Sequence, residues 1–349
     1  MQAPSPSLPP RPGSSMLPGG PAGPPGGPAG APPPMALPPF HTQFSGYAVE
    51  FSPFEDNKLA VATSQHFGIV GNGRQYVLQV DPKGGGLMEL ISFATQDGVY
   101  DCSWSEENEH HLVSGSGDGS IKLWNVAAPP EQNPLRSYEE HTHEVYSVDW
   151  NLVSKDTFIS GAWDDTIKLW SPERPQSLST WKEHQYCIYS TIWSPTSATL
   201  FASASGDGTL KLWETNERQS VLTIPAHETF EILTCDWNKY DENIIVTGSV
   251  DKCIKTWDIR KPMQPLHTLK GHTYAVRRVK CSPHSETTIA SVSYDMSTII
   301  WDLAHPEDPM LARYEQHSEF VVGVDWNIFV EGQLATCAWD ELVCVFHQG

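Results

Sequence analysis

Positive charge is scarce in this 349-residue sequence: 22 Lys and Arg stand against 42 Asp and Glu, and the formal net charge is −20. An acidic surface repels phosphate backbones, and no stretch rich in Lys and Arg provides a local exception. We therefore expect no direct binding of nucleic acid.

Long apolar runs are also missing. No run approaches the roughly 18 to 20 residues needed to span a bilayer, and the N-terminus lacks the charged-then-apolar order of a secretion signal. The seven Cys form no C-x-x-C pair, and the His residues show no metal-ligand spacing. We therefore expect an intracellular chain with reduced thiols, no direct membrane insertion, no metal and no cofactor.

Proline and glycine are unevenly distributed. Residues 1–39 contain 15 Pro and 7 Gly, and Arg11 is their only charged residue. A segment of this composition cannot bury a core, so it is predicted to be a disordered, partly polyproline arm. The folded part is then expected over residues 40–349.

An internal repeat runs through this folded part. Six times an Asp precedes an aromatic residue by six positions, a hydroxyl stands four residues before the Asp, and successive copies are 43 to 46 residues apart. Five copies also have a His 23 or 24 residues before the Asp. The six Asp-to-aromatic endings are Asp118 to Trp124, Asp164 to Trp170, Asp207 to Trp213, Asp251 to Trp257, Asp295 to Trp301 and Asp340 to Phe346.

Each period contains three short apolar or alternating runs and a weaker fourth, which predicts a four-stranded antiparallel unit. Units of about 44 residues with four strands are typical of propeller blades. The sequence therefore predicts an all-β, seven-bladed propeller. The expected blades are 46–92, 97–138, 141–182, 184–225, 227–270, 272–314 and 317–349, the last closed by residues 38–45. The first unit is degenerate, with Val80 in place of the Trp and Asn72-Gly73 as its predicted turn.

His, Ser and Asp in one unit have the composition of a catalytic triad. Because the same set recurs in five units, we interpret it as a buried hydrogen-bond network that also satisfies the Trp indole. The predicted network residues are His141, Ser160, Asp164, Trp170, His184, Ser203, Asp207, Trp213, His227, Thr247, Asp251, Trp257, His272, Ser291, Asp295, Trp301, His317, Thr336 and Asp340.

Acids and large aromatics gather where the loop entering each inner strand meets the turn that carries the repeated Asp. We predict that they form an exposed surface suited to a short cationic, amphipathic helix, although each could instead be ordinary surface or strand packing. The candidate binding residues are Asp97, Tyr100, Glu144, Tyr146, Trp163, Tyr189, Glu231, Arg277, Tyr294, Glu319 and Trp339.

The endings GDGSIKLWN, WDDTIKLWS and GDGTLKLWE resemble the WD-repeat family. The segments between them, among them SGYAVEFSPFEDNKLAVAT, HEVYSVDWN, LTCDWNKYDEN, GHTYAVRRVKCSPH and HSEFVVGVDW, resemble the receptors for type 2 peroxisomal targeting signals, the peroxin-7 family, in its fungal form.

This resemblance implies an import receptor, not an enzyme, that captures matrix enzymes by an N-terminal basic, helical signal. It also implies a co-receptor, delivery to the peroxisomal docking complex, and cycling between cytosol and peroxisome. Asp97 and Glu144 would then pair with basic signal residues, and Tyr100, Tyr146, Tyr189 and Trp163 would line the groove. Glu231 and Glu319 are the weaker candidates.

Two other functions are compatible with an acidic propeller. A WD-repeat scaffold could bind cationic helices such as histone segments. A propeller enzyme would need an unrepeated acid/base or metal cluster near the central channel, and the sequence shows none.

Overall fold

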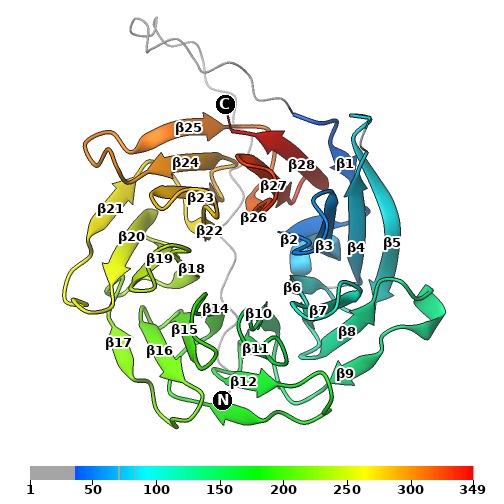
Figure 1. Cartoon of the computed structure of the whole chain (residues 1–349), viewed down its shortest axis with the longest axis horizontal. Coiled ribbons are helices and arrows are strands. Elements are labelled where there is room, and N and C mark those ends of the chain that lie inside the picture. The colour runs from blue at the N-terminus through cyan, green and yellow to red at the C-terminus, as the bar shows by residue number, and fades with distance from the viewer. Residues whose placement is uncertain (1–35, 70, 82, 349) are drawn as a thin grey trace, which may run out of the picture. The chain divides into compact units, whose positions relative to one another are not determined.

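A computed structural model describes residues 36–69, 71–81 and 83–348. These residues form a ring of seven four-stranded antiparallel sheets (Figure 1), which confirms the predicted all-β, seven-bladed propeller. Residues 1–35, most of the predicted disordered arm, lie outside the described residues.

The blades follow the chain in order, and each runs from the central channel outward. Blade 1 consists of β2 (Ser45–Phe51), β3 (Lys58–Ser64), β4 (Gly73–Val80) and β5 (Leu87–Thr95). Blade 2 consists of β6 (Val99–Trp104), β7 (His111–Ser116), β8 (Ile121–Asn125) and β9 (Arg136–Tyr138). Blade 3 consists of β10 (Val145–Trp150), β11 (Phe158–Ala162), β12 (Ile167–Trp170) and β13 (Ser179–Trp181). Blades 4 and 5 consist of β14 (Ile188–Trp193), β15 (Leu200–Ser205), β16 (Leu210–Glu214) and β17 (Leu222–Ile224), and β18 (Ile232–Trp237), β19 (Ile244–Ser249), β20 (Cys253–Asp258) and β21 (His267–Lys270). Blades 6 and 7 consist of β22 (Val276–Cys281), β23 (Thr288–Ser293), β24 (Thr298–Asp302) and β25 (Met310–Tyr314), and β26 (Val321–Trp326), β27 (Gln333–Ala338), β28 (Leu342–His347) and β1 (Phe40–His41).

Blade 7 joins the two ends of the ring. Its outer strand β1 pairs antiparallel with β28, with Phe40 opposite Val343. The pairing extends further toward the N-terminus than predicted, because the Leu37 amide donates to the Val345 carbonyl at 2.9 Å. The predicted boundary of the arm at residue 39 is therefore too late, since an apolar Leu37 packs against the cluster that blades 7 and 1 share. This pairing covers the sheet edge that an open ring would expose.

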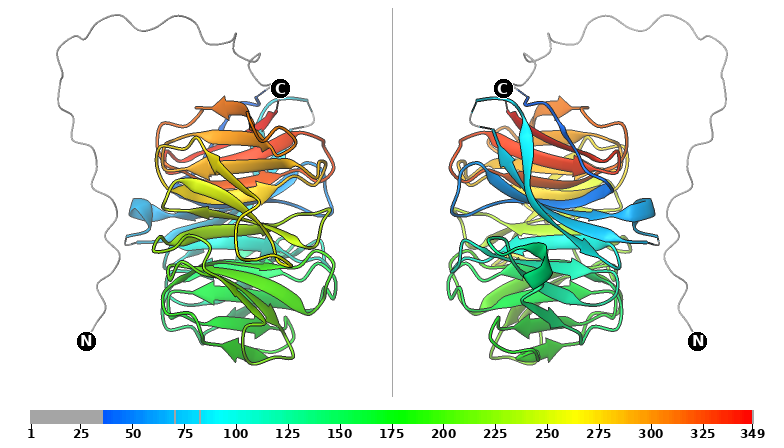
Figure 2. Two further views of the ribbon diagram at one scale, coloured as in Figure 1. Left: turned by 90° about the vertical axis from the view of Figure 1, so that its left-hand side faces the viewer. Right: turned by 90° about the vertical axis from the view of Figure 1, so that its right-hand side faces the viewer.

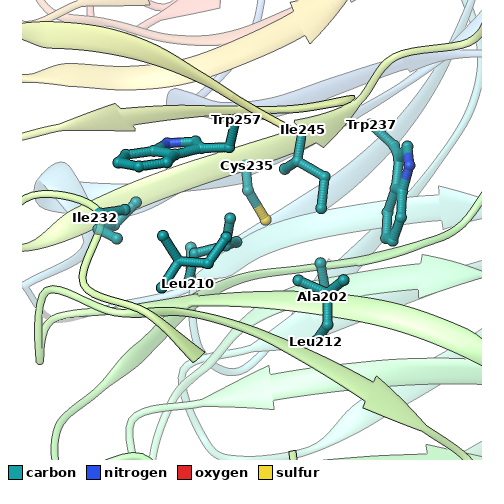
Figure 3. Packing of buried hydrophobic residues seen from close by; sticks show 11 residues of the cluster. Ala202, Leu210, Leu212, Ile232, Cys235, Trp237, Ile245 and Trp257 are labelled. Carbon is teal, nitrogen blue, oxygen red and sulfur yellow. The ribbon is translucent and has the colours of Figure 1, made fainter. Parts of the chain in front are cut away.

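Apolar side chains fill the spaces between neighbouring blades. Between blades 4 and 5, Leu210 and Leu212 pack against Ile232, Trp237 and Trp257 (Figure 3). Every described inner strand contributes to such a layer, and a buried Trp ends five of them, with Phe51 and Cys281 at the same place in β2 and β22. All seven Cys are free and six are buried.

Side chains of the inner strands also bond one blade to the next. Asp149 accepts the Trp193 amide at 2.6 Å, and Asp325 accepts the Phe51 amide at 2.8 Å. In three other blades an inner-strand side chain accepts a backbone amide of the following blade in the same way: Glu50, Ser103 and Asp236. These bonds satisfy inner-strand amides that have no partner within their own sheet.

Buried charges line the central channel below its mouth. Arg278 donates to Asp101 at 2.9 and 3.0 Å, from blade 6 across to blade 2, and Lys280 lies 3.5 Å from Asp325. Burial raises the pKa of Asp149 to about 7, although the Trp193 amide and two lysines counteract it. The charge of this carboxylate therefore costs stability.

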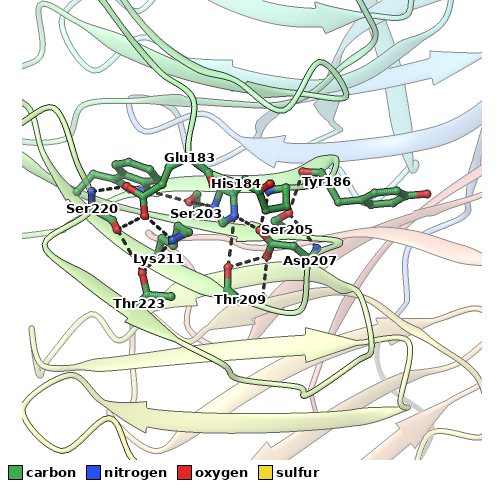
Figure 4. Close-up of polar contacts among 12 residues, drawn as sticks. Glu183, His184, Tyr186, Ser203, Ser205, Asp207, Thr209, Lys211, Ser220 and Thr223 are labelled. Carbon is green, nitrogen blue, oxygen red and sulfur yellow. Dashed lines mark hydrogen bonds and ion pairs between the residues drawn. The ribbon is translucent and has the colours of Figure 1, made fainter. Parts of the chain in front are cut away.

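The predicted network occurs in blade 4 as a continuous chain of hydrogen bonds (Figure 4). The Trp213 indole donates to Ser203 Oγ at 2.8 Å, His184 Nε2 lies 2.7 Å from the same Oγ, and His184 Nδ1 lies 2.8 Å from Asp207. Because the indole donates to Oγ, the hydroxyl donates to Nε2 and Nδ1–H donates to the carboxylate. Burial raises the pKa of Asp207, but hydrogen bonds from His184, Thr209 and the Gln185 amide lower it by more than burial raises it. The pKa of Asp207 therefore lies below its usual value.

Blades 3, 5 and 6 repeat these contacts, from His141, His227 and His272. Blade 7 keeps the His317, Thr336 and Asp340 contacts, with Phe346 in place of the indole. Blade 2 lacks the His, and Asp118 accepts from Ser120 and Lys122 instead. The network therefore belongs to the scaffold and is not a single reactive site.

The edge-on views show a short 3-10 segment, η1 (Gln65–Gly68), that projects from one face of the ring (Figure 2). A second, η2 (Pro130–Gln132), precedes β9. No helix in the described part of the chain has the length and apolar character to cross a membrane.

Replacing Asp207 tests the network. Asp207→Ala is expected to lower the free energy of unfolding by about 1 to 3 kcal/mol, because His184 then loses its buried acceptor. Asp118→Ala is the matched control and is expected to cost less, since blade 2 has no His to leave unsatisfied. Urea denaturation of both variants measures the difference, and equal losses would contradict the network.

Replacing Asp149 tests the channel charge. A carboxyl whose pKa is raised on folding contributes stability at low pH that is lost as pH rises from about 4 through its folded value. Asp149→Asn retains an oxygen for the Trp193 amide but cannot ionise. Relative to the native protein, the variant is expected to gain about 4 kcal/mol between pH 4 and pH 8, because the pKa of Asp149 rises from 3.8 to about 7 on folding. A stability difference that does not change with pH would show that Asp149 is not desolvated.

Candidate functional site

One face of the ring carries all the predicted binding residues. We call it the upper face: it is formed by the loop that enters each inner strand and by the turn between the second and third strands of each blade. Backbone hydrogen bonds join the loop and the turn of a blade. In blade 3 the Trp163 amide donates to the Glu144 carbonyl at 2.9 Å, and in blade 7 the Trp339 amide donates to the Phe320 carbonyl at 3.0 Å. Each predicted acid therefore lies beside a turn of its own blade.

Every inner strand has a β-bulge at the same place near this face. The residue skipped by the pairing turns its side chain toward the channel, as bulges commonly re-aim a side chain. We call these seven residues the mouth ring: Tyr47, Tyr100, Tyr146, Tyr189, Leu233, Arg277 and Val322. The sequence prediction included four of them and missed Tyr47, Leu233 and Val322, although they occupy the same position relative to the buried Trp or its equivalent.

The predicted aromatics form one continuous cluster around the mouth ring. Tyr146 stacks on Tyr100 and on Trp163, with ring centroids 4.7 Å apart in both pairs, and meets Tyr189 edge-on at 5.8 Å. On the other side Tyr294 lies 6.2 Å from Trp339. Tyr47, which was not predicted, bridges these groups at 5.0 Å from Tyr100 and 5.9 Å from Trp339. Phe320, also not predicted, lies 5.1 Å from Trp339.

The expected exposure of these rings is wrong for three of them. Tyr100, Tyr189 and Trp339 are only 4%, 7% and 8% exposed, and Tyr146, Trp163 and Tyr294 are half-buried. Because the rings stack on one another across the mouth, they form a floor and not a set of separate exposed side chains. Their role in binding stays a prediction.

Asp97 and Glu144 lie at the edge of this floor, on blades 2 and 3. Both are half-buried, and neither forms an ion pair with any residue that the structure describes. Burial raises the pKa of Tyr100 well above its usual value, and the charges of Asp97 and Glu144 raise it further, so both carboxylates lie near this ring. Gly117 provides the space for Asp97, since a Cβ there would lie 2.8 Å from the carboxylate.

The remaining predicted acids differ from this pair. Glu231 accepts a hydrogen bond from the Tyr189 hydroxyl at 2.8 Å, so part of its acceptor capacity is used. Glu319 precedes Phe320 on blade 7 and is half-buried. Asp97 and Glu144 therefore place two carboxylates without ion pairs near Tyr100, on blades 2 and 3.

The degenerate first blade adds a loop that sequence reasoning missed. Asn72-Gly73 is not the turn, because Gly73 already pairs with Ser64 and residues 65–72 form a longer connection. Within it the Phe67 carbonyl accepts the Tyr47 hydroxyl at 2.7 Å, and the Gly68 carbonyl accepts the Tyr100 hydroxyl at 2.8 Å. The positive φ of Gly68 and Gly71 permits this path, and the run FGIVGNG was the available signal.

The chemistry of the upper face favours binding. No group of three or more His, Cys, Asp or Glu among the described residues could hold a metal ion. The His, Ser and Asp sets are repeated scaffold elements, as shown above. What remains is an aromatic floor with unpaired carboxylates at one edge, which suits an amphipathic cationic ligand.

Comparison with known families agrees with this architecture. The family model described as WD domain, G-beta repeat matches residues 89–125, 132–171, 175–214, 218–258 and 263–302, which is more than half of the chain. The crystal structure of the WD40 β-propeller domain of Doa1 superposes with a TM-score of 0.75 at 21% identity, and covers 90% of this chain and 96% of that one. At this identity the likeness concerns the fold alone.

Curated relatives match over shorter stretches. A Dictyostelium discoideum protein named peroxisomal targeting signal 2 receptor is 61% identical over 106 residues, 30% of this chain and 33% of that protein. An Arabidopsis thaliana protein named peroxisome biogenesis protein 7 is 52% identical over 109 residues, 31% and 34% of the two chains. A Saccharomyces cerevisiae protein named peroxisomal targeting signal 2 receptor is 36% identical over 142 residues, 40% and 37%. The matches span about a third of each relative's length.

Proposed function

We propose, on the premise that the chain belongs to the WD-domain, G-beta repeat family, that it is a receptor for peroxisomal targeting signal 2. Relatives from an amoeba, a plant and a yeast support this proposal by their names. A receptor of this kind binds and releases its ligand without covalent chemistry, so the proposal includes no enzymatic activity.

One observation supports the upper face as the place where the signal binds. The carboxylates of Asp97 and Glu144 have no ion-pair partner among the described residues. They lie beside the stacked rings of Tyr100, Tyr146 and Trp163. A basic amphipathic helix would supply cations to the carboxylates and an apolar flank to the rings. Glu231, Glu319, Tyr189, Tyr294 and Trp339 would extend this contact over the remaining blades.

The proposal extends to the steps around binding. The signal is the N-terminal type 2 signal of peroxisomal matrix enzymes, a co-receptor completes the complex, and the docking complex receives it at the peroxisome. The receptor then cycles between cytosol and peroxisome. A scaffold for cationic helices such as histone segments would use the same carboxylates, and it is separated from the receptor by ligand selectivity.

Charge reversal tests the proposed contact. Fluorescence anisotropy with a labelled basic, helical type 2 signal peptide is expected to show binding that weakens with salt, because screening over about 10 Å at 0.1 M reduces the attraction. Asp97→Lys and Glu144→Lys are each expected to weaken binding at least tenfold, with little change in melting temperature. The control is Glu331→Lys, an exposed acid in the β26–β27 loop on the opposite face.

Selectivity is measured with a charge-matched histone peptide in the same assay. Tighter binding of the signal peptide supports the receptor, and equal or tighter binding of the histone peptide would replace the receptor with the scaffold. Full binding by both reversal variants would show that the signal does not contact Asp97 or Glu144.

A further inference from the structure

A groove of about 610 Å³ runs along the outer side of the ring between blades 1 and 2, where β5 and β8 are neighbours (Figure 1). One wall comes from the end of β5 and the residue that follows it, including Phe93 and Gln96. The other wall comes from β8 and the turn before it, from Asp118 to Trp124, and the loop that contains η2 forms the far end. The residues that line this groove are distinct from the candidate binding residues of the upper face.

The groove lies where the repeated network is incomplete. Asp118 is the repeated Asp of blade 2, and its side chain is 38% exposed. The equivalent Asp side chains of blades 3 to 7 are only 2% to 16% exposed, and each has a His beside it. Thr95 stands 23 residues before Asp118, where other blades have the His, and its hydroxyl donates to the Asp97 carbonyl at 2.6 Å instead. Asp118 is therefore open to the groove.

A second contact of the scaffold is also missing in blade 2. In blade 3 Lys168 donates to Glu140, the residue before the His, at 3.2 Å, and blade 4 repeats this contact. Blade 2 keeps the lysine as Lys122 but has no acid at the place of Glu140. Lys122 lies 3.4 Å from Asp118, which is the one ion pair that Asp118 forms with the residues that the structure describes.

The groove has an excess of negative charge. Asp118, Glu131 and Glu139 line it, and Lys122 is the one basic residue in its walls. Glu131 and Glu139 are exposed and form no ion pair within the described part of the chain. Ser120 donates to Oδ1 of Asp118 through its amide and its hydroxyl, so Oδ2 has only the 3.4 Å contact with Lys122. One carboxylate oxygen therefore has room for a stronger donor.

We propose that this groove is a docking site for an extended segment of a partner protein, which places a basic side chain on Oδ2 of Asp118. The comparison among blades supports the position, because a His nitrogen lies at the Oδ2 atom of the equivalent Asp in five blades. The net negative charge of the groove favours a cation, and charge-assisted hydrogen bonds are the stronger ones. The proposal goes beyond the receptor function and does not depend on it.

The shape of the groove suits an extended chain. From Asp118 to Trp124 it follows one strand and its preceding turn for at most about 20 Å, which six extended residues span. Phe93 and Trp124 stack at 4.8 Å in its walls, and Pro130 and Pro134 add apolar surface at its far end. Small apolar residues next to the basic side chain therefore have a surface to contact.

Peptide pools test the docking site on the full chain. The probes are labelled hexapeptides with Arg, Lys or citrulline at the third position and a mixture of Ala, Ser, Leu and Pro at the others, and fluorescence anisotropy measures their binding. The native protein is expected to bind the Arg and Lys pools at least tenfold tighter than the citrulline pool, because citrulline is neutral but has nearly the shape of Arg. Equal binding of the three pools would overturn the proposal.

Two matched variants assign the preference to Asp118. Asp118→Asn is expected to abolish it with little change in melting temperature, since Asn keeps an oxygen for the Ser120 bonds but carries no charge. Asp156→Asn, an exposed acid in the β10–β11 loop, is the control and is expected to retain it. An unchanged preference in Asp118→Asn would overturn the docking site. Equal weakening of all three pools together with a lowered melting temperature would do the same, because Asp118 would then act through the fold.

Binding of the type 2 signal peptide separates this proposal from the receptor function. A saturating amount of unlabelled signal peptide is expected to leave the Arg pool bound, and Asp118→Asn is expected to bind the signal peptide as tightly as the native protein. Displacement of the Arg pool by the signal peptide would overturn the docking site and leave the receptor intact. Failure of the native protein to bind the signal peptide would overturn the receptor and leave the docking site intact.

Discussion

The closing of the ring is the constraint on which the remaining structure depends. Strand β1, from the N-terminal side, completes a sheet whose other three strands come from the C-terminal end. Once the ring is closed, each inner strand contacts two neighbours, and acceptors such as Asp149 and Asp325 can satisfy an amide of the next blade. The same closure brings seven bulged residues together at one mouth, so the candidate site exists only in the complete ring.

Repetition and its interruption divide the chain between scaffold and site. The His, Ser or Thr, and Asp contacts recur in blades 3 to 7 with nearly constant distances, as expected for a structural element. At the mouth ring the repeat changes: blade 5 has Leu233, blade 6 has Arg277 and blade 7 has Val322 in the position where four blades have Tyr. Variation at a position whose geometry is constant is where a propeller can acquire specificity.

Sequence reasoning predicted the repeat, the blade count and the network because each depends on spacing along the chain. It failed where the outcome depends on neighbouring blades. Tyr100 and Trp339 were expected to be exposed, but stacking with Tyr146 and Tyr47 buries them. The prediction of a turn at Asn72-Gly73 was wrong, because the hydroxyls of Tyr47 and Tyr100 donate to the carbonyls of a longer loop. The buried Nε1 atoms of Trp163 and Trp339, which lack hydrogen-bond partners, need coordinates to be recognised, since composition does not show which polar groups lack partners.

The central claim is that ligand binds the upper face around the mouth ring. Hydrogen–deuterium exchange of the full chain with and without a type 2 signal peptide tests it most directly. The account predicts slower exchange in the loops around residues 95–100 and 142–146 and in the turn around 294–296, with no change in the opposite loops 52–57 and 327–332. Protection confined to those opposite loops, or to the outer strands of the blades, would contradict it.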